Sequence, residues 1–138
     1  VARFYKVTPG QDWPGVLAES EAFLGAWQLK PQKGLEQQLA MVYLSAGDAL
    51  MALKRYPEAV EWLTAGIEKT GFPAKGWVTY CYLRRAQALD LQGRRLDALA
   101  DYRRAAARPN FWDSQKYARA GLKAAPSYEE VYRQLTAD

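Results

Sequence analysis

The sequence predicts an all-α fold of about seven short helices, and three features of the chain predict it. Apolar residues recur at steps of three and four along most of the 138 residues, which is the spacing of one helix face. Proline and glycine interrupt this pattern at short intervals, as they do between helices. No segment shows the sustained two-residue alternation of a strand. With 49% apolar and 25% charged residues, the chain has the composition of a folded domain.

The first helix is predicted to begin at Asp12, after an extended lead-in over residues 1–11. The Asp12 side chain can cap the helix, and Pro14 is tolerated in its first turn. Lys30-Pro31 ends the helix, because proline lacks an amide hydrogen. The apolar stripe that should face the core consists of Trp13, Val16, Leu17, Phe23, Leu24 and Trp27.

The second helix has the clearest stripe in the chain, over about five turns. Its apolar positions are Leu35, Leu39, Val42, Tyr43, Ala46, Leu50 and Leu53. Tyr56-Pro57 breaks this helix and opens a third one, whose stripe consists of Val60, Leu63 and Ile67. Gly71 stands where a left-handed C-terminal cap belongs, and Pro73 follows it, so the third helix should end there.

The fourth and fifth helices are predicted from about Trp77 onward, with a break at Gly93. The fourth helix carries Trp77, Cys81, Leu83, Ala88, Leu89 and Leu91. The fifth helix carries Leu96, Leu99, Tyr102 and Ala106, and Pro109 ends it.

The last two helices are predicted from their caps. Asp113 or Ser114 can cap a sixth helix, which Pro126 ends. Ser127 followed by Glu130 matches the capping box S-x-x-E, in which each side chain can bond to the backbone amide of the other residue. A seventh, largely polar helix should therefore follow Ser127.

Two stretches of the chain match each other at a constant offset of 39 residues, seen when Ala59 is aligned with Ala98. The matched residues are Tyr43, Ala46-Gly47, Leu50, Tyr56, Ala59, Leu63 and Gly66 in the first stretch, and Tyr82, Arg85-Ala86, Leu89, Arg95, Ala98, Tyr102 and Ala105 in the second. Small residues at matched sites would allow two helix axes to approach closely, while large neighbours fill the grooves.

These matched positions resemble the tetratricopeptide repeat, a pair of antiparallel helices of about 34 residues. The residues that carry the resemblance most directly are Gly47, Ala59, Ala98, Tyr102 and Ala105. Arg85 departs from the family pattern by replacing a small or apolar residue, and about five extra residues separate the copies near residues 74–78. The structural alternatives are a generic helical bundle and other kinds of helical repeat.

The resemblance implies a right-handed superhelical stack of helix pairs. Its parts would be the lead-in segment 1–11, a half repeat 12–31, a repeat 40–73, a repeat 79–112, and a truncated repeat with a capping helix 113–138. Residues 12–138 would then form a single domain.

The resemblance also implies a concave surface formed by the first helix of each pair, which this family uses to hold peptides or helices. The groove residues that it assigns are Met41, Leu44, Asp48 and Met51, then Tyr80, Leu83, Arg84 and Gln87, then Gln115, Ala118, Arg119 and Leu122. The implied function is a non-catalytic adaptor or scaffold. Its partner would be another polypeptide that offers an apolar or amphipathic segment with some negative charge. The open alternative is that the chain's own terminal helix or a neighbouring repeat fills the groove.

One ligand class of the family does not suit these groove residues. Family members that grip chaperone C-termini use Lys, Asn and Arg around a terminal carboxylate. The matching positions here are Leu44, Asp48, Arg84, Gln115 and Arg119, of which only Arg119 fits. A carboxylate clamp is therefore not expected.

The residue inventory argues against an enzyme. The chain has no histidine, the commonest general base near neutral pH and the commonest nitrogen ligand of metals. Its single cysteine, Cys81, can form neither an intrachain disulfide nor a cysteine-based zinc site, and we expect a small buried helix residue. No phosphate-binding loop, catalytic triad or metal-ligand spacing appears, so no cofactor or metal is expected. No apolar run approaches the roughly 18 residues of a membrane span, and one cysteine does not distinguish a cytoplasmic from a periplasmic location.

The net charge of +4 is concentrated in the second half of the chain, in Arg84-Arg85, Arg94-Arg95 and Arg103-Arg104 among other residues. These arginines alternate with Asp90, Asp97 and Asp101. At helical spacing the pattern predicts a solvated, ion-paired face, and the acids weaken the field that a nucleic acid would need. Nucleic-acid binding is therefore the less favoured hypothesis.

Two further hypotheses concern assembly. About two and a half repeats are few for an isolated stack, since about three normally bury a continuous core. The chain is therefore also interpreted as a self-assembly module or as the C-terminal domain of a larger protein, and its start at Val1 agrees with an excised or processed piece. Phe111-Trp112 is interpreted either as a loop anchor between two repeats or as an exposed contact patch.

Overall fold

A computed structural model describes residues 12–34, 36–70 and 75–136 of the chain. Within these ranges the protein contains seven helices and no strand, which confirms the all-α prediction. The helices are α1 (Trp13–Leu29), α2 (Glu36–Ala52), α3 (Tyr56–Thr70), α4 (Lys75–Leu91), α5 (Arg95–Ala106), α6 (Ser114–Lys123) and α7 (Tyr128–Leu135). The predicted lead-in over residues 1–11 and the predicted cap at Gly71 lie outside the described residues.

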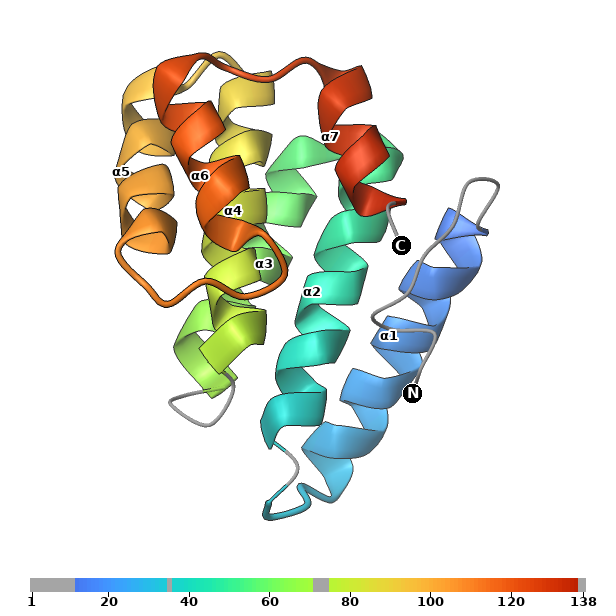
Figure 1. The fold of residues 1–138 in the computed structure, drawn as a ribbon. Helices are drawn as coiled ribbons and strands as arrows, with labels where there is room; N and C mark the ends of the chain where they lie inside the picture. Colours follow the sequence, from blue (N-terminus) through green and yellow to red (C-terminus); the bar gives the residue numbers. More distant parts are fainter. Residues whose placement is uncertain (1–11, 35, 71–74, 137–138) are drawn as a thin grey trace.

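Helices that follow one another in the sequence also pack against one another, from α1 through α6 (Figure 1). In addition, α4 contacts both α2 and α6, so alternate helices line one side of the molecule. The chain then returns from α6, and α7 lies against α2 (Figure 1). We refer to the side formed by α2 and α4, on which α7 rests, as the α2–α4 face.

The α2 helix is the centre of the core. Nearly every residue from Leu39 to Met51 is buried, because α1, α3, α4 and α7 all pack around this helix. The largest side chains in the core with less than 2% exposure include Leu50, Leu63, Leu83 and Tyr102. Burial of each such side chain stabilises the fold by about 1.5–3 kcal/mol relative to exposure.

Small residues lie where the helices come closest. A Cβ atom added at Gly47 would lie 2.4 Å from Cδ2 of Leu63, and one added at Gly121 would lie 2.3 Å from Cε1 of Tyr102. Ala59 and Ala98, which the internal alignment pairs, are both completely buried. These sites therefore have no room for a larger side chain, as the sequence predicted.

The turn between α2 and α3 and the turn between α4 and α5 have the same hydrogen bonds. The amide of Arg55 donates to the carbonyl of Leu50 at 2.8 Å, and the amide of Arg94 donates to the carbonyl of Leu89 at 2.9 Å. The residue before each arginine has a positive φ, 61° at Lys54 and 78° at Gly93. Gly93 thus ends α4 as predicted, because glycine adopts this conformation without a steric penalty.

The predicted caps of α1 and α7 are present, whereas α6 begins differently. Asp12 accepts from the amide of Gly15 at 3.1 Å, and Ser127 accepts from the amide of Glu130 at 3.2 Å. Asp113 occupies the N-cap position of α6 with a φ of 65° and makes no capping hydrogen bond. Its left-handed backbone departs from the extended geometry that a capping side chain uses. The side chain of Asn110 serves instead and accepts from the amide of Gln115 at 3.1 Å.

The apolar stripe predicted along α1 is only half inside the core. Trp13, Val16 and Leu17 are buried, but Phe23 and Trp27 remain partly exposed. The difference arises because α7 reaches the Trp13 end of α1, where the Trp13 and Tyr132 rings lie 6.0 Å apart. The other end of α1 lies beside α2, away from α7 (Figure 1), so this half of α1 is less covered.

Candidate interaction surface

A buried polar network lies where α7 meets the α2–α4 face. The Oε1 atom of Gln134 on α7 accepts from Nη1 of Arg84 at 3.0 Å and from Nε2 of Gln87 at 2.8 Å. Arg84 and Gln87 lie one turn apart on α4, and Nη1 of Arg84 also donates to Oε1 of Gln87 at 2.9 Å. One amide group of α7 therefore completes a network that α4 already forms within itself.

The charge of Arg84 is balanced by Asp48 on α2. Nε of Arg84 donates to Oδ1 of Asp48 at 3.2 Å, and the two side chains are 4% and 15% exposed. Burial raises the pKa of the Asp48 carboxyl to about 6, although the neighbouring Arg84 guanidinium opposes this rise. The guanidinium also lies 5.3 Å above the ring of Tyr80. Arg84 thus has neighbours on α2, α4 and α7.

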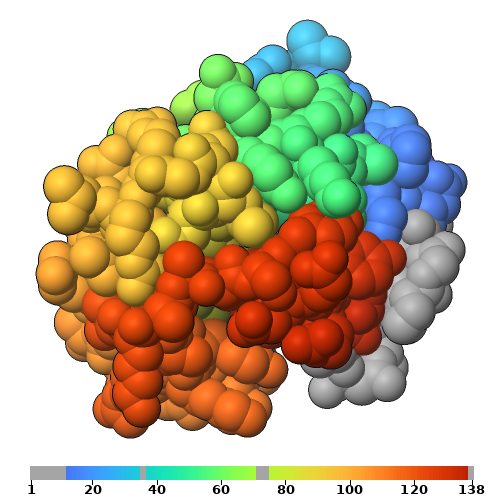
Figure 2. Space-filling model, turned by 90° about the horizontal axis from the view of Figure 1, so that it is seen from above, coloured from blue at the N-terminus to red at the C-terminus, as the bar shows by residue number. Residues whose placement is uncertain are grey.

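Around this network, α7 makes apolar and aromatic contacts. Val131 and Leu135, which lie one helical turn apart, are 1% and 3% exposed. The hydroxyl of Tyr128 donates to the carbonyl of Ala52 at the end of α2, at 2.6 Å. Nε1 of Trp13 on α1 donates to the hydroxyl of Tyr132 at 3.3 Å. Figure 2 shows α7 between the ends of α2 and α1, beside the segment that leads to it from α6.

The predicted groove residues lie mostly inside the protein in this conformation. Arg119 alone among the twelve is exposed, and Asp48, Gln115 and Leu122 are half-buried. The buried members are Met41, Leu44, Met51, Tyr80, Leu83, Arg84, Gln87 and Ala118. The structure brings Asp48, Arg84 and Gln87 together as one cluster, and the chain's own α7 covers it. Their role in binding another polypeptide stays a prediction.

Trp112 combines both roles that were considered for the Phe111-Trp112 loop. Its side chain is 61% exposed, yet its ring lies 4.9 Å from that of Trp77. The hydroxyl of Tyr80 donates to its backbone carbonyl. A Cβ atom at Gly76 would lie 2.9 Å from the Trp112 ring, so glycine makes room for this contact. The loop is therefore anchored on the first turns of α4 while one side of Trp112 faces outward.

The acids that alternate with the arginine pairs are not all solvated, which corrects the prediction. Asp101 is 2% exposed and accepts from Nε and Nη2 of Arg85 at 2.7 and 2.8 Å and from Nη1 of Arg104 at 2.6 Å. Arg85 also donates to the hydroxyl of Thr64 on α3 at 3.0 Å. Arg85, which departs from the family pattern, is thus held by a buried carboxylate between α3, α4 and α5.

A second aspartate with a buried side chain, Asp90, is likewise paired with an arginine. Asp90 is 1% exposed and accepts from Arg95 at 2.7 Å and from the hydroxyl of Tyr102 at 2.9 Å. Among the three arginine pairs, five of the six side chains form ion pairs with aspartate, and only the Arg94–Asp97 pair is exposed on both sides. Arg84, Arg85 and Arg95 thus pair with carboxylates that are at most 15% exposed, whereas Arg94, Arg103 and Arg104 remain exposed. That nucleic-acid binding is the less favoured function stays a prediction.

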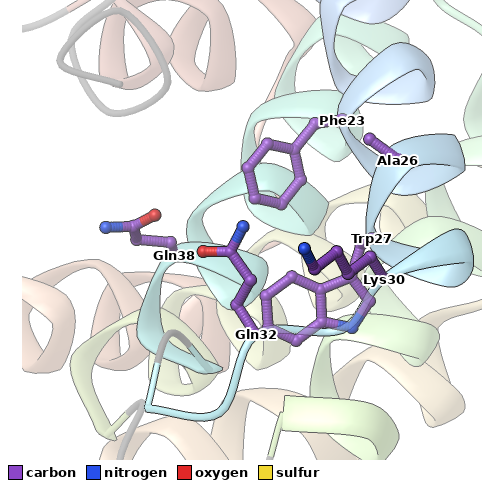
Figure 3. A pocket seen from close by; sticks show the side chains of 6 residues that line it. All are labelled: Phe23, Ala26, Trp27, Lys30, Gln32 and Gln38. Atoms are coloured by element: carbon purple, nitrogen blue, oxygen red, sulfur yellow. The ribbon is translucent and has the colours of Figure 1, made fainter.

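A shallow hollow lies between the exposed half of α1 and the start of α2 (Figure 3). Its volume is about 300 Å³. Phe23 and Trp27 stack along it with ring centroids 6.2 Å apart. The other lining residues are Ala26, Lys30, Gln32 and Gln38. This hollow was not predicted, because the sequence pattern assigned both aromatic residues to the core.

The sequence analysis gave the chain's own terminal helix as one of two alternative occupants of the groove, and the structure places α7 there, but the role of Gln134 was missed. The spacing of Val131 and Leu135 indicates a helix with one apolar side, but it does not say which surface the helix covers. Gln134 bonds to residues 50 and 47 positions earlier, and a single glutamine carries no signal of such a distant partner.

Within the described residues, no group of three His, Cys, Asp or Glu side chains could hold a metal ion. Cys81 is completely buried, as predicted, and burial raises the pKa of its thiol. Among the helices of these ranges, none has the length and apolar character needed to cross a membrane.

Comparisons of the chain with protein-family models, with curated proteins and with solved structures gave no match.

Proposed function

We propose that the protein is a non-catalytic interaction module that holds a helical segment of another polypeptide on its α2–α4 face. The observation that carries this proposal is the seat of α7, where an amphipathic helix rests on α2 and bonds to Arg84 and Gln87 of α4. A surface with an apolar floor and a few convergent polar groups is typical of sites that hold amphipathic helices.

The internal symmetry supports a repeat architecture of the tetratricopeptide kind. The two helix pairs α2–α3 and α4–α5 share the turn hydrogen bonds at Arg55 and Arg94 and completely buried alanines at Ala59 and Ala98. In our proposal these pairs form two successive units of a right-handed stack, α1 is half of an earlier unit, and α6 begins a later one. The α2–α4 face is then the concave side of the stack.

The contacts of α7 refine the kind of ligand that this face suits. Asp48 already neutralises Arg84, so a ligand needs no negative charge at the centre of the face. It needs instead an amide or hydroxyl oxygen that accepts from Arg84 and Gln87, because buried donors without acceptors are costly. Aliphatic side chains one turn apart would fill the space that Val131 and Leu135 fill here.

This function is tested by affinity capture with chemical crosslinking, using the full chain and a Gln87→Leu variant. Gln87 is 1% exposed, and leucine keeps its approximate volume while removing the amide donor. Proteins held on the α2–α4 face should be recovered at least about tenfold less well with the variant, as expected when a buried hydrogen bond is lost. The matched control is Arg103→Ala, a change at an exposed residue on α5. Equal recovery with Gln87→Leu and the wild type would contradict the proposal.

Self-association is a second candidate, favoured by the exposed half of α1. Phe23 and Trp27 line the hollow of about 300 Å³, and Leu29, two residues beyond Trp27 at the end of α1, is 89% exposed. Large apolar side chains that remain partly exposed together, as Phe23 and Trp27 do here, often mark a contact surface. If copies of the chain associate there, Trp27→Asp should convert a dimer or larger assembly into a monomer in analytical ultracentrifugation. A wild-type chain that stays monomeric at high concentration would exclude this candidate.

A further inference from the structure

We propose that α7 is a built-in competitor for the α2–α4 face, and that an incoming helix with the same pattern of side chains displaces it. This inference rests on the proposed function and adds its regulation, since the face would be closed by α7 until a matching helix arrives. The partner is defined by chemistry: an amphipathic helix with two aliphatic residues four positions apart and an amide side chain directly before the second one.

The α7 helix depends on its seat for its structure. It has eight residues, which is below the length at which an isolated helix is stable in water. The segment that joins it to α6 is extended, with a ψ of 143° at Ala124 and of 164° at Ser127. Ala124, Ala125 and Ser127 are all exposed. No tight turn therefore fixes α7 to α6, in contrast to the turns after α2 and α4.

The polar network of the face survives the departure of α7. Arg84 keeps its ion pair with Asp48 at 3.2 Å and its hydrogen bond to Oε1 of Gln87 at 2.9 Å. Removal of Gln134 thus leaves no buried charge without a partner, which is the large cost that usually prevents such an opening. Water or a ligand can take over the two donors that Gln134 releases.

A partner helix does not need the side chains of α7 that face the solvent, because these point away from the α2–α4 face. Glu129, Glu130 and Arg133 are exposed, whereas Val131, Gln134 and Leu135 are directed to the face. Tyr128 and Tyr132 lie at the edge, where they bond to the carbonyl of Ala52 and to Trp13. A partner helix is therefore recognised through the pattern V-x-x-Q-L or a close variant of it.

The test uses a fluorescent peptide with the sequence of residues 125–138 as the probe and the full chain as the receptor. In Val131→Asp, a charge at a 1% exposed position drives the chain's own α7 from its seat. Such a variant should bind the probe at least about tenfold more tightly than the wild type, because the competing occupant is removed. Gln134→Ala, which removes only two hydrogen bonds, should give a smaller gain. Arg133→Ala, on the exposed side of α7, should bind like the wild type.

Two results would overturn the inference. One is that Val131→Asp and Gln134→Ala bind the probe no better than the wild type. The other is that Val131→Asp loses helical circular dichroism well beyond the share of α7, because α7 would then be an integral part of the core. If capture of partners still depends on Gln87 in either case, the proposed function stands and only the regulation by α7 is wrong.

Discussion

The two helix pairs α2–α3 and α4–α5 have the same turn but different side chains where the helices meet. In the first pair, Trp62 packs against Tyr43 with ring centroids 5.9 Å apart, and Ala46 lies one turn along α2. Offset by 39 residues, the second pair has Asp101 in place of Trp62 and Arg85 in place of Ala46. These two form a buried ion pair at 2.7 Å, and the guanidinium lies 5.6 Å above Tyr82.

The comparison shows that one backbone arrangement can be stabilised in two ways. In the first pair the energy comes from apolar contact and from the close approach that Gly47 permits. In the second pair the buried carboxylate of Asp101 accepts from Arg85, whose side chain is 16% exposed, and from the exposed Arg104. The two pairs should therefore respond very differently to substitution, even though their turns are alike.

The largest effect is expected at Asp101. Replacement by alanine leaves Arg85, whose side chain is 16% exposed, without its carboxylate, so Asp101→Ala should lower the free energy of unfolding by about 3–5 kcal/mol. Urea denaturation followed by circular dichroism measures this change. Asp97→Ala is the matched control, because the Arg94–Asp97 pair is exposed and should contribute at most about 1 kcal/mol. Similar losses for the two variants would show that the Asp101 pair is no more important than a surface pair.

The next largest effect on stability is expected at Asp48. This residue matches Gln87 at the offset of 39 residues, but only Asp48 can ionise. Its pKa is raised from 3.8 to about 6, so the folded state holds the proton more tightly than the unfolded state. Its contribution to stability is greatest below about pH 4 and is lost as the pH rises through about 6, on the order of 3 kcal/mol. Asp48→Asn should remove this decline in urea titrations between pH 4 and 7. Parallel pH profiles for the variant and the wild type would mean that the Asp48 pKa is not raised.

A smaller effect is expected from Gly47→Ala. The added methyl group would lie 2.4 Å from Leu63, so overpacking should cost about 1–2 kcal/mol. Gly25→Ala is the matched control in α1, since no atom lies within 4 Å of its added Cβ. There the better helix propensity of alanine should stabilise the protein by up to about 1 kcal/mol. Opposite signs for the two thermal shifts are expected, and a stabilising Gly47→Ala would refute the close approach of α2 and α3.

The smallest effect on stability is expected in the turn between α2 and α3 and the turn between α4 and α5, which have the same hydrogen bonds. Gly93 has a φ of 78° with open space around it, so Gly93→Ala should cost about 1 kcal/mol through backbone strain alone. Lys54 already bears a side chain at the matched position, with a φ of 61°. Lys54→Gly should therefore relieve strain instead of adding it, apart from the loss of the Lys54 contact over the Tyr128 ring at 4.5 Å. Equal destabilisation by both changes would indicate that the two turns differ.

Features that depend on nearby residues were predictable from the sequence. The stripe of α2, the stop at Gly93 and the cap at Asp12 each follow from residues within a few positions of one another. The burial of Asp101 was not predictable, because alternating charges have the same pattern on a solvated face and around a buried acid. The cap by Asn110 was also missed, since it depends on the left-handed turn at Trp112 and Asp113.

The candidate interaction surface was only partly predictable. The internal repeat placed Asp48, Arg84 and Gln87 on one surface, and the structure does bring these three together. The sequence left open whether the chain's own terminal helix, a neighbouring repeat or another polypeptide covers them, because the contacts of α7 span from 47 to 119 residues along the chain. An apolar side on a short terminal helix indicates that it must pack somewhere, but several surfaces could receive it.

Native-state hydrogen exchange tests most directly whether α7 is a separable occupant of the α2–α4 face. Amides of α7 should exchange through a local opening whose free energy is clearly below that of α2 and α4, and low urea concentrations should leave that opening almost unchanged. If the amides of Val131 to Leu135 are instead protected as strongly as those of Leu83 to Gln87, with the same dependence on urea, then α7 unfolds only with the whole domain and cannot act as a displaceable helix.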